Sequence, residues 1–479
     1  MLFNSVEFFL FLPLAFALYW TLARGPLRLQ NLFLIAASYV FYGWWDWRFL
    51  LLIIASSAVD YSIGLAIDRT RDRRTRRSLL GASLMANLGL LFTFKYYGFF
   101  ADSAAAAMRE LGWEPSFPTL EIILPVGISF YTFQTLSYTI DVYQKKTAAT
   151  RDPVAFFAFV CFFPQLVAGP IERSGFLKQF LVRREFDETA ARDGCRQMLW
   201  GLFKKVVVAD SIAPHVAYVF ENHGELQGPV LLVGAFLFSF QLYGDFSGYS
   251  DIAIGTARLF GFSLSRNFRY PLFATSIGDF WSRWHISLTT WFRDYVFKPL
   301  YRAFRLPGGA AAAVMATFAV SGLWHGANWT FVAWGALNGG LFLLSVVWKR
   351  RVGSAVRSRS WTGLARASRN AWTFIVLSLA LVLFRSESVP AAVGYLESVP
   401  FGWDHWPSYP AEFSKRLDDV TIVIGLIVQF GLEWLNQDFQ HGLSRLPEAV
   451  FLRWPLYWLL ALAGLQYVVR PQEFIYFQF

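Results

Sequence analysis

Apolar runs long enough to cross a bilayer recur along nearly the whole chain, and they constrain the fold more than any other feature. A membrane-spanning helix needs roughly 20 mostly apolar residues. Of the 479 residues, 55% are hydrophobic and only 16% are charged, whereas soluble domains carry about 25% charged residues. We therefore expect an all-α polytopic membrane protein with about 11–12 membrane helices. The expected spans lie near residues 6–23, 30–45, 49–67, 79–100, 121–141, 198–220, 229–247, 310–325, 330–348, 371–385, 419–436 and 454–470.

One further apolar run, residues 154–170, is not expected to cross. Pro164 and the Gly169-Pro170 pair interrupt it. Non-helical backbone at membrane depth is tolerated only where protein buries it or where it lines a cavity. We therefore predict a broken or re-entrant segment here.

The basic residues also follow a membrane pattern. The formal net charge is +10, and a positive charge of this size is compatible with a nucleic-acid partner. The basic residues gather, however, in short loops at 68–78, 172–196 and 349–370. This matches the positive-inside rule rather than a basic face for nucleic acid. We predict that these loops face the cytoplasm, that the C-terminal tail lies outside it, and that no nucleic acid is bound.

Polar residues between 243 and 300 break the apolar pattern. Asp245 and Asp251 lie in a glycine-rich segment, in which we predict a turn at 244–248. Asn267, Asp279 and Arg283 follow among many aromatic residues. Such a stretch is too polar to face lipid and too aromatic for a water-exposed loop. Over residues 276–299 we expect amphipathic helices that line a polar funnel inside the helix bundle.

Two histidines in aromatic segments are the candidate catalytic residues. An imidazole at membrane depth is energetically costly unless it interacts with another polar group or has a function. His325 ends an apolar run and is followed by Gly326, which gives a substrate little steric hindrance. We predict that His325 is a general base and that His285 supports it. A purely structural histidine is the alternative for each. Trp324, Asn328, His285 and backbone amides near Gly326 are candidate donors to an oxyanion.

A zinc site is the main rival interpretation of these residues. Two histidines and a nearby aspartate could bind zinc, but the sequence has neither an HExxH motif nor a compact His/Cys spacing. We predict no metal site and no bound cofactor.

Several long blocks of the sequence resemble the membrane-bound O-acyltransferases, and within them the bacterial alginate O-acetylation branch. The blocks lie at residues 124–141, 163–173, 243–255, 267–300 and 322–339. The resemblance covers nearly the whole chain, which we expect to form one membrane domain, residues 1–479, with its core motifs at 121–348. It implies a ring of helices around a central funnel, with His325 as the essential histidine and His285 as its companion.

The resemblance also implies the reaction and its partners. An acetyl group, expected to come from cytoplasmic acetyl-CoA, would cross the bacterial inner membrane for O-acetylation of alginate or a related secreted polysaccharide. SGNH-type acetyltransferase or esterase proteins in the periplasm, with serine-hydrolase-like folds, would complete the transfer. Membrane lipid and the polysaccharide acceptor are the other expected partners.

The C-terminal tail, residues 470–479, carries a separate hypothesis. It ends in aromatic residues around Tyr476. It is similar to the aromatic C-terminal motif of the small membrane peptide of teichoic-acid D-alanylation systems, in which a tyrosine is proposed as an acyl relay. Tyr476 is therefore a candidate acetyl relay on the periplasmic side. Anchoring at the membrane interface is the alternative.

Other functions remain open on the sequence alone. The acceptor could be a cell-wall polymer or cellulose instead, and modification of a lipid is a weaker option. A transporter or channel for a polar solute would also use intramembrane charges and broken segments. A general base beside a glycine distinguishes the acyltransferase from the channel.

Overall fold

The computed structural model describes residues 1–114, 123–167, 169–356, 363–403, 420–446, 449–467 and 474–475, and for 352–356 and 466–467 it describes the backbone alone. Every regular element in these residues is helical. Five helical segments are long and apolar enough to cross a membrane, and four shorter helices are apolar. The expected all-α polytopic membrane protein is thus confirmed. The ring arrangement, the count of about 11–12 membrane helices and the single domain stay predictions.

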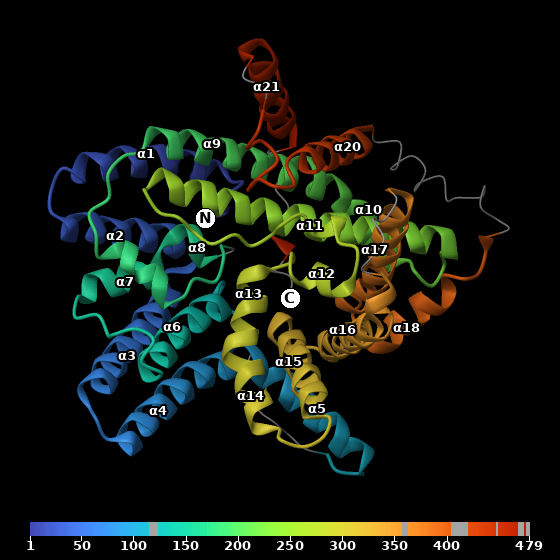
Figure 1. Ribbon diagram of the computed structural model, residues 1–479, viewed down its shortest axis with the longest axis horizontal. Coiled ribbons are helices and arrows are strands. Elements are labelled where there is room, and N and C mark those ends of the chain that lie inside the picture. Colours follow the sequence, from blue (N-terminus) through green and yellow to red (C-terminus); the bar gives the residue numbers. More distant parts are fainter. Residues whose placement is uncertain are drawn as a thin grey trace. The chain divides into compact units, whose positions relative to one another are not determined.

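Internal contacts divide the chain into two compact units. The first comprises Met1–Gly194 and Ala253–Ser265, and the second comprises Cys195–Ile252 and Arg266–Phe479. The helical elements within the first unit are α1 (Val6–Leu22), α2 (Leu27–Asp46), η1 (Trp47–Phe49), α3 (Leu50–Arg69), α4 (Arg73–Leu91), η2 (Phe92–Tyr96), α5 (Tyr97–Glu110), α6 (Ile128–Tyr143), α7 (Pro153–Cys161), α8 (Phe163–Leu166) and η3 (Ser174–Phe180) (Figure 1).

A buried carboxylate joins three helices of the first unit. Asp60 on α3 accepts hydrogen bonds from Ser83 Oγ on α4 at 2.5 Å and from Thr139 Oγ1 on α6 at 2.9 Å. Asn87 Nδ2, also on α4, donates to Asp60 at 2.8 Å. A buried polar group stabilises a fold only when it is satisfied. These bonds therefore fix how α3, α4 and α6 pack together.

The apolar run 154–170 is broken, as its prolines predict. Asp152 caps α7 by accepting from the backbone N–H of Val154 at 2.9 Å. The helix ends at Cys161, and Phe162 (φ −50°, ψ 107°) leaves the helical conformation. Pro164 then falls in the first turn of α8, where a missing N–H does no harm. Both short helices are largely buried, so the prediction of a broken, protein-covered segment is confirmed.

The second unit holds the elements that carry the candidate site. Two helices also contribute residues to the first unit, α9 (Glu188–Leu202) and α11 (Gly228–Leu259). The others are η4 (Phe203–Ala209), α10 (Asp210–Glu221), η5 (Pro271–Phe273), α12 (Ile277–Trp281), α13 (Ile286–Phe292), η6 (Arg293–Phe297), α14 (Lys298–Ala303), α15 (Gly309–His325), α16 (Trp329–Val356), α17 (Gly363–Arg385), α18 (Val389–Ser398), α20 (Val420–Leu435) and α21 (Val450–Tyr467).

The predicted turn at 244–248 is wrong. Helix α11 runs without a break from Gly228 to Leu259, so Asp245 and Asp251 stand on a helix rather than on a loop. The glycines there serve packing. A Cβ on Gly248 would come 3.0 Å from the backbone nitrogen of Lys205, and only glycine lets the two segments approach this closely. Local turn propensity was overridden by tertiary packing.

Helices α15 and α16 form a tight hairpin (Figure 1). Gly322 on α15 faces Gly335 on α16, and a Cβ on either would lie 3.2 Å from the Cα of the other. Small residues at such a crossing let two helix backbones pack against each other. The end of α15, with His325, is thereby held against the start of α16.

Candidate active site

His325 is the last residue of α15. The chain leaves the helix at Gly326, which is extended (φ −158°, ψ 151°). Two residues later, Asn328 caps the next helix, because its Oδ1 accepts from the backbone N–H of Thr330 at 3.0 Å. The imidazole therefore stands at the end of α15, directly before a short turn that Asn328 closes onto the next helix.

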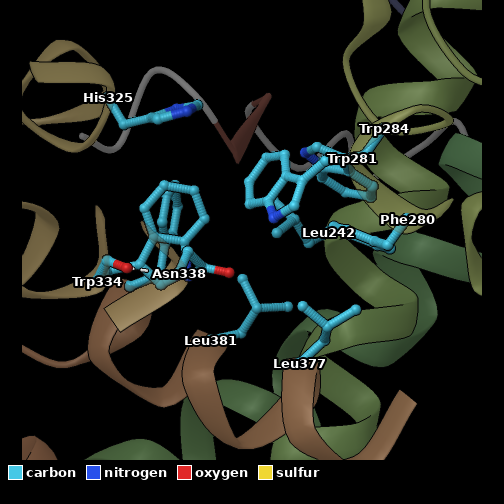
Figure 2. Close-up of a pocket in the computed structure, with 10 residues that line it drawn as sticks. Leu242, Phe280, Trp281, Trp284, His325, Trp334, Asn338, Leu377 and Leu381 are labelled. Atoms are coloured by element: carbon cyan, nitrogen blue, oxygen red, sulfur yellow. Dashed lines mark hydrogen bonds between the residues drawn. The ribbon is translucent and has the colours of Figure 1, made fainter. Parts of the chain in front are cut away.

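Aromatic rings surround the His325 imidazole. The ring centroids of Trp324, Trp334 and Phe384 lie 5.0, 5.3 and 5.4 Å from it. His325 lines a mostly apolar pocket in the second unit (Figure 2). The pocket is lined by Leu242, Phe280, Trp281, Trp284, His325, Trp334, Asn338, Leu377, Leu381 and Phe384. An apolar pocket that converges on a few polar groups is the usual form of a small-molecule site.

Two polar atoms in this pocket find no hydrogen-bond partner among the described residues. One is the indole Nε1 of Trp281, a donor, and the other is Oδ1 of Asn338, an acceptor. The Nδ2 of Asn338 is used, because it donates to the backbone carbonyl of Trp334 at 2.9 Å. In Figure 2 the Trp281 nitrogen and the Asn338 oxygen face the same space as His325. The pocket thus offers one donor, one acceptor and an imidazole to a ligand.

His285 is buried close to His325. Its ring centroid lies 6.1 Å from that of Trp324, which contacts His325, and 4.7 Å from that of Phe246. Only 1% of His285 is exposed, and neither ring nitrogen has a hydrogen-bond partner within the part of the chain that the structure describes. The structure therefore brings the two predicted histidines into one aromatic cluster.

The backbone of His285 is strained. Its φ of 42° and ψ of 54° lie in the left-handed region, which costs a residue with a Cβ roughly 1–2 kcal/mol. Asn267 holds this turn in place. Its carbonyl accepts from the N–H of Ile286 at 2.8 Å, and its Oδ1 accepts from Ser287 Oγ at 2.9 Å. Strain of this kind collects at functional sites, where the surrounding structure over-determines the conformation.

The other predicted lining residues have structural partners. Asp279 and Arg283 pair with each other at 2.8 Å, four residues apart. Asn328, besides capping α16, donates from Nδ2 to the carbonyl of Glu387 at 3.0 Å. Trp324 is buried beside both histidines. Of these four residues, Trp324 contacts both catalytic candidates.

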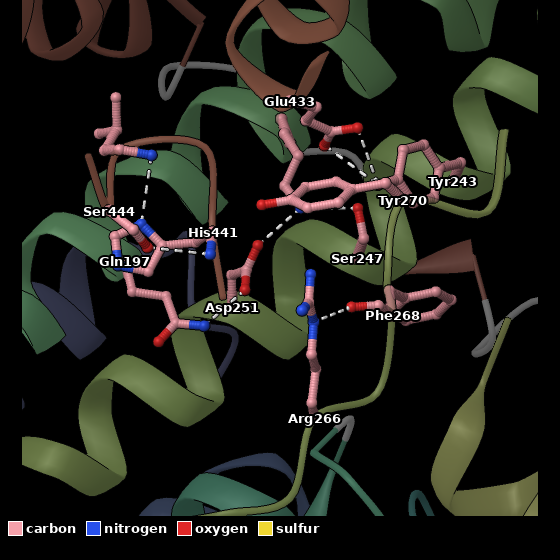
Figure 3. A network of polar contacts seen from close by, with 12 residues as sticks. Gln197, Tyr243, Ser247, Asp251, Arg266, Phe268, Tyr270, Glu433, His441 and Ser444 are labelled. Atoms are coloured by element: carbon pink, nitrogen blue, oxygen red, sulfur yellow. Dashed lines mark hydrogen bonds and ion pairs between the residues drawn. The ribbon is translucent and has the colours of Figure 1, made fainter. Parts of the chain in front are cut away.

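Asp245 and Asp251 lie in buried ion pairs. Asp251 binds Lys204 Nζ at 2.6 Å and accepts from Gln197 Nε2 at 2.7 Å (Figure 3). Asp245 binds the next lysine, Lys205, at 2.6 Å. Both lysines are at most 3% exposed. Buried charges persist only where they are paired in this way.

The lysines stand on η4, a π-helical segment inserted between α9 and α10. Such insertions are frequent at functional sites. Our sequence prediction missed both lysines, and it also missed Glu433 on α20, which accepts from the Tyr243 hydroxyl at 2.9 Å (Figure 3). The signal was present, because Lys204, Lys205 and Glu433 are ionisable residues inside predicted spans.

The C-terminal segment enters the second unit. Phe474 is fully buried and Ile475 is 2% exposed. The predicted relay residue, Tyr476, lies outside the described residues. Among the described residues no group of three or more His, Cys, Asp or Glu side chains could hold a metal ion.

Comparisons with known proteins agree with the resemblance. The model of the membrane-bound O-acyltransferase family matches residues 131–386. The chain is 39% identical over 449 residues to the probable alginate O-acetylase AlgI of Azotobacter vinelandii, covering 93% of this chain and 87% of that protein. It is 34% identical to the peptidoglycan O-acetyltransferase of Helicobacter pylori, over 88% of this chain and 85% of that protein. A teichoic acid D-alanyltransferase of Streptococcus thermophilus is 28% identical over 54% of this chain and 67% of its own length.

Proposed function

The chain belongs to the membrane-bound O-acyltransferase family, and from this premise we propose that it O-acetylates a secreted polysaccharide of the alginate type. The acetyl donor is acetyl-CoA on the cytoplasmic side of the inner membrane. Similarity to proteins named alginate O-acetylase over most of both chains supports the choice of acceptor. The observation that carries the proposal is His325 in its aromatic pocket, with a second buried histidine in the same cluster.

In this proposal His325 acts as the general base. Its imidazole takes the proton of the attacking hydroxyl as the hydroxyl oxygen forms a bond to the thioester carbonyl carbon. The carbon–sulfur bond then breaks, and the imidazolium returns the proton to the leaving thiolate of CoA. A positioned imidazole contributes typically about 10²–10⁴-fold to such a step.

The oxyanion that forms during attack needs a hydrogen-bond donor. Trp281 is our first choice, because its indole N–H faces the pocket and has no partner among the described residues. Asn328 is a weaker choice than the sequence suggested, since its amide already donates to Glu387. His285 is the second donor, or it orients the substrate beside His325. Trp324 packs between the two imidazoles and keeps them in place.

The acetyl group leaves through the tail in this proposal. Tyr476 accepts the acetyl group on its hydroxyl and passes it to a serine of an SGNH-type periplasmic partner. The distribution of basic residues among the loops, from which we predict a tail outside the cytoplasm, supports this direction. Asp245, Asp251, Asn267, Asp279 and Arg283 shape the polar interior around this path rather than taking part in bond making.

Acetyl content of the polymer tests the function directly. Cells that depend on this chain for O-acetylation should lose polymer acetylation with His325→Ala, expressed at the wild-type level. His223→Ala is the matched control, since His223 lies just after α10, contacts Phe220 and Tyr395, and does not line the pocket. Full acetylation with His325→Ala would disprove the role of the base. Intact mass of the purified chain, with and without Tyr476→Phe, tests the relay.

A second acceptor has one observation in its favour. The similarity to a peptidoglycan O-acetyltransferase extends over 88% of the chain. Cell-wall polymer is therefore the alternative acceptor for the same chemistry. Analysis of both polymers from the same cells distinguishes the two.

A further inference from the structure

The described end of the C-terminal tail is bound inside the second unit. The Phe474 ring lies 4.3 Å from that of Tyr249 and 5.8 Å from that of Phe246. Phe246 in turn contacts His285, with 4.7 Å between ring centroids. Phe474 is fully buried, whereas a residue that anchors a chain at the interface keeps its ring among the lipid headgroups. The tail thus reaches the aromatic cluster that holds the two histidines.

The carboxylate of Asp245 binds the backbone of this segment at Ile475. Asp245 Oδ2 accepts a hydrogen bond from the N–H of Ile475 at 2.7 Å. The other oxygen, Oδ1, is paired with Lys205 Nζ at 2.6 Å, and the same lysine binds Asp210 at 2.8 Å. Hydrogen bonds that involve an ionised group are about twice as strong as neutral ones. The bond is to the backbone of the segment and does not use the side chain of Ile475.

The neighbouring ion pair has no such role in the described structure. Asp251 stands six residues further along α11 and is paired with Lys204 as Asp245 is paired with Lys205. Its second oxygen accepts from Gln197 on α9 instead of from the tail. Two buried pairs of the same chemistry therefore differ in their second partner. This difference assigns the tail to Asp245 specifically.

We propose that Asp245, oriented by Lys205, is a positioning residue that binds the C-terminal segment through the N–H of Ile475 and holds it beside His285. The inference deepens the proposed acetyl relay and rests on it for its catalytic meaning. Tyr476 follows Ile475 directly in the chain, so the bond at Ile475 acts on the residue next to the proposed relay. Productive orientation of reacting groups is a large part of catalysis.

Accessibility of the tail tests the docking without measuring activity. A cysteine in place of Gln478, in a Cys195→Ser background, would be labelled with a membrane-impermeant maleimide in the full-length protein. Cys161 is buried and gives little background, whereas Cys195 is exposed. Asp245→Ala removes the acceptor, and Ile475→Pro removes the donor without touching the buried ion pair. Loss of a charged hydrogen bond should speed labelling about tenfold or more in either variant.

Matched variants separate this bond from a general loosening of the unit. Ile475→Ala keeps the N–H but loses the same buried side chain as Ile475→Pro, so it should be labelled more slowly than Ile475→Pro. Asp251→Ala disrupts the neighbouring ion pair and should be labelled at a rate near that of the parent. Combining Asp245→Ala with Ile475→Pro should give no more than the larger single effect, because both remove one bond. Unchanged labelling in Asp245→Ala and Ile475→Pro would overturn the proposal. Equal acceleration by Asp251→Ala would overturn it as well.

Acetyl transfer measured on the same variants distinguishes this proposal from the relay. If the docking and the relay both hold, Asp245→Ala should lower acetylation of Tyr476 as it frees the tail. Asp245→Asn retains an acceptor oxygen, so it should keep part of the docking and part of the acetylation. If labelling responds as expected but Tyr476→Phe transfers acetyl at the wild-type rate, Asp245 docks the tail and the relay is wrong.

Discussion

Replacing Gly326 with alanine should lower both the stability and the activity of the enzyme. An added Cβ would meet the edge of the Phe331 ring, with Cζ at 2.7 Å and two further ring carbons closer still, against 3.4 Å or more for ordinary contact. The ring cannot move freely, because it packs edge-on against Phe384 with 4.8 Å between centroids. Gly326 is thus required by the packing of the turn that carries His325.

The magnitude follows from this packing. Forcing one extra carbon into a well-packed site costs typically about 1–3 kcal/mol of the free energy of unfolding. Phe384 would have to shift, and its ring centroid lies 5.4 Å from that of the His325 imidazole. A shift of the base by about 1 Å can reduce the rate about 10²-fold. We therefore expect Gly326→Ala to reduce acetyl transfer by about 10–100-fold.

Thermal unfolding in detergent and acetyl transfer from acetyl-CoA would be measured on the same preparations. Gly340→Ala is the matched control, because a Cβ there meets nothing within 4 Å, and alanine in a helix is favoured over glycine by about 1 kcal/mol. A second change, Phe331→Leu, should restore part of the activity of Gly326→Ala. Wild-type stability and activity in Gly326→Ala would refute the packing argument. Loss of activity without rescue would instead favour contact of Gly326 with substrate.

Three further substitutions test other parts of the second unit. Lys205→Met should lower the free energy of unfolding by about 3–5 kcal/mol, because it leaves Asp210 and Asp245 buried without their cation; a melting temperature near that of the wild type would contradict this. Asn328→Ala should cost about 1 kcal/mol through loss of the helix cap, whereas Asn328→Asp should retain the cap; equal melting temperatures of the two variants would count against a capping role. His285→Asn should fold, because asparagine tolerates the left-handed region, but should lose about 10²-fold or more of acetyl transfer, and undiminished transfer would exclude His285 from catalysis.

Much of the fold could be predicted from apolar runs alone, because lipid dictates helix length and composition. The run 310–325 corresponds to α15, Gly309–His325, and Pro164 correctly marked a broken segment. The short helix α18 was not predicted, since it has no full apolar run, whereas α12, α13 and the start of α14 fall in the stretch 276–299, for which amphipathic helices without individual bounds were expected. They are held by tertiary packing, which a local pattern does not contain.

The candidate site was predicted only in part. The two histidines could be found because a polar ring among aromatic residues is conspicuous, and they do share one cluster. The partners of Asp245 and Asp251 could not be found this way, because Lys205 and Lys204 lie 40 and 47 residues away in the chain. The turn was predicted at Asp245 because the local sequence does not show its contact with this distant lysine. Its glycine neighbours favour turns locally, and only the distant lysine shows why a carboxylate stands on a helix.

The central claim is that His325 is the base of an acetyl transfer from acetyl-CoA, and one measurement tests it most directly. The purified protein would be incubated with acetyl-CoA labelled in the acetyl group, and label bound covalently to the chain would be followed in the wild type, His325→Ala and His223→Ala. We expect label on the wild type and on His223→Ala, and its loss from His325→Ala by at least about 10²-fold. Equal labelling of His325→Ala and the wild type would contradict the claim.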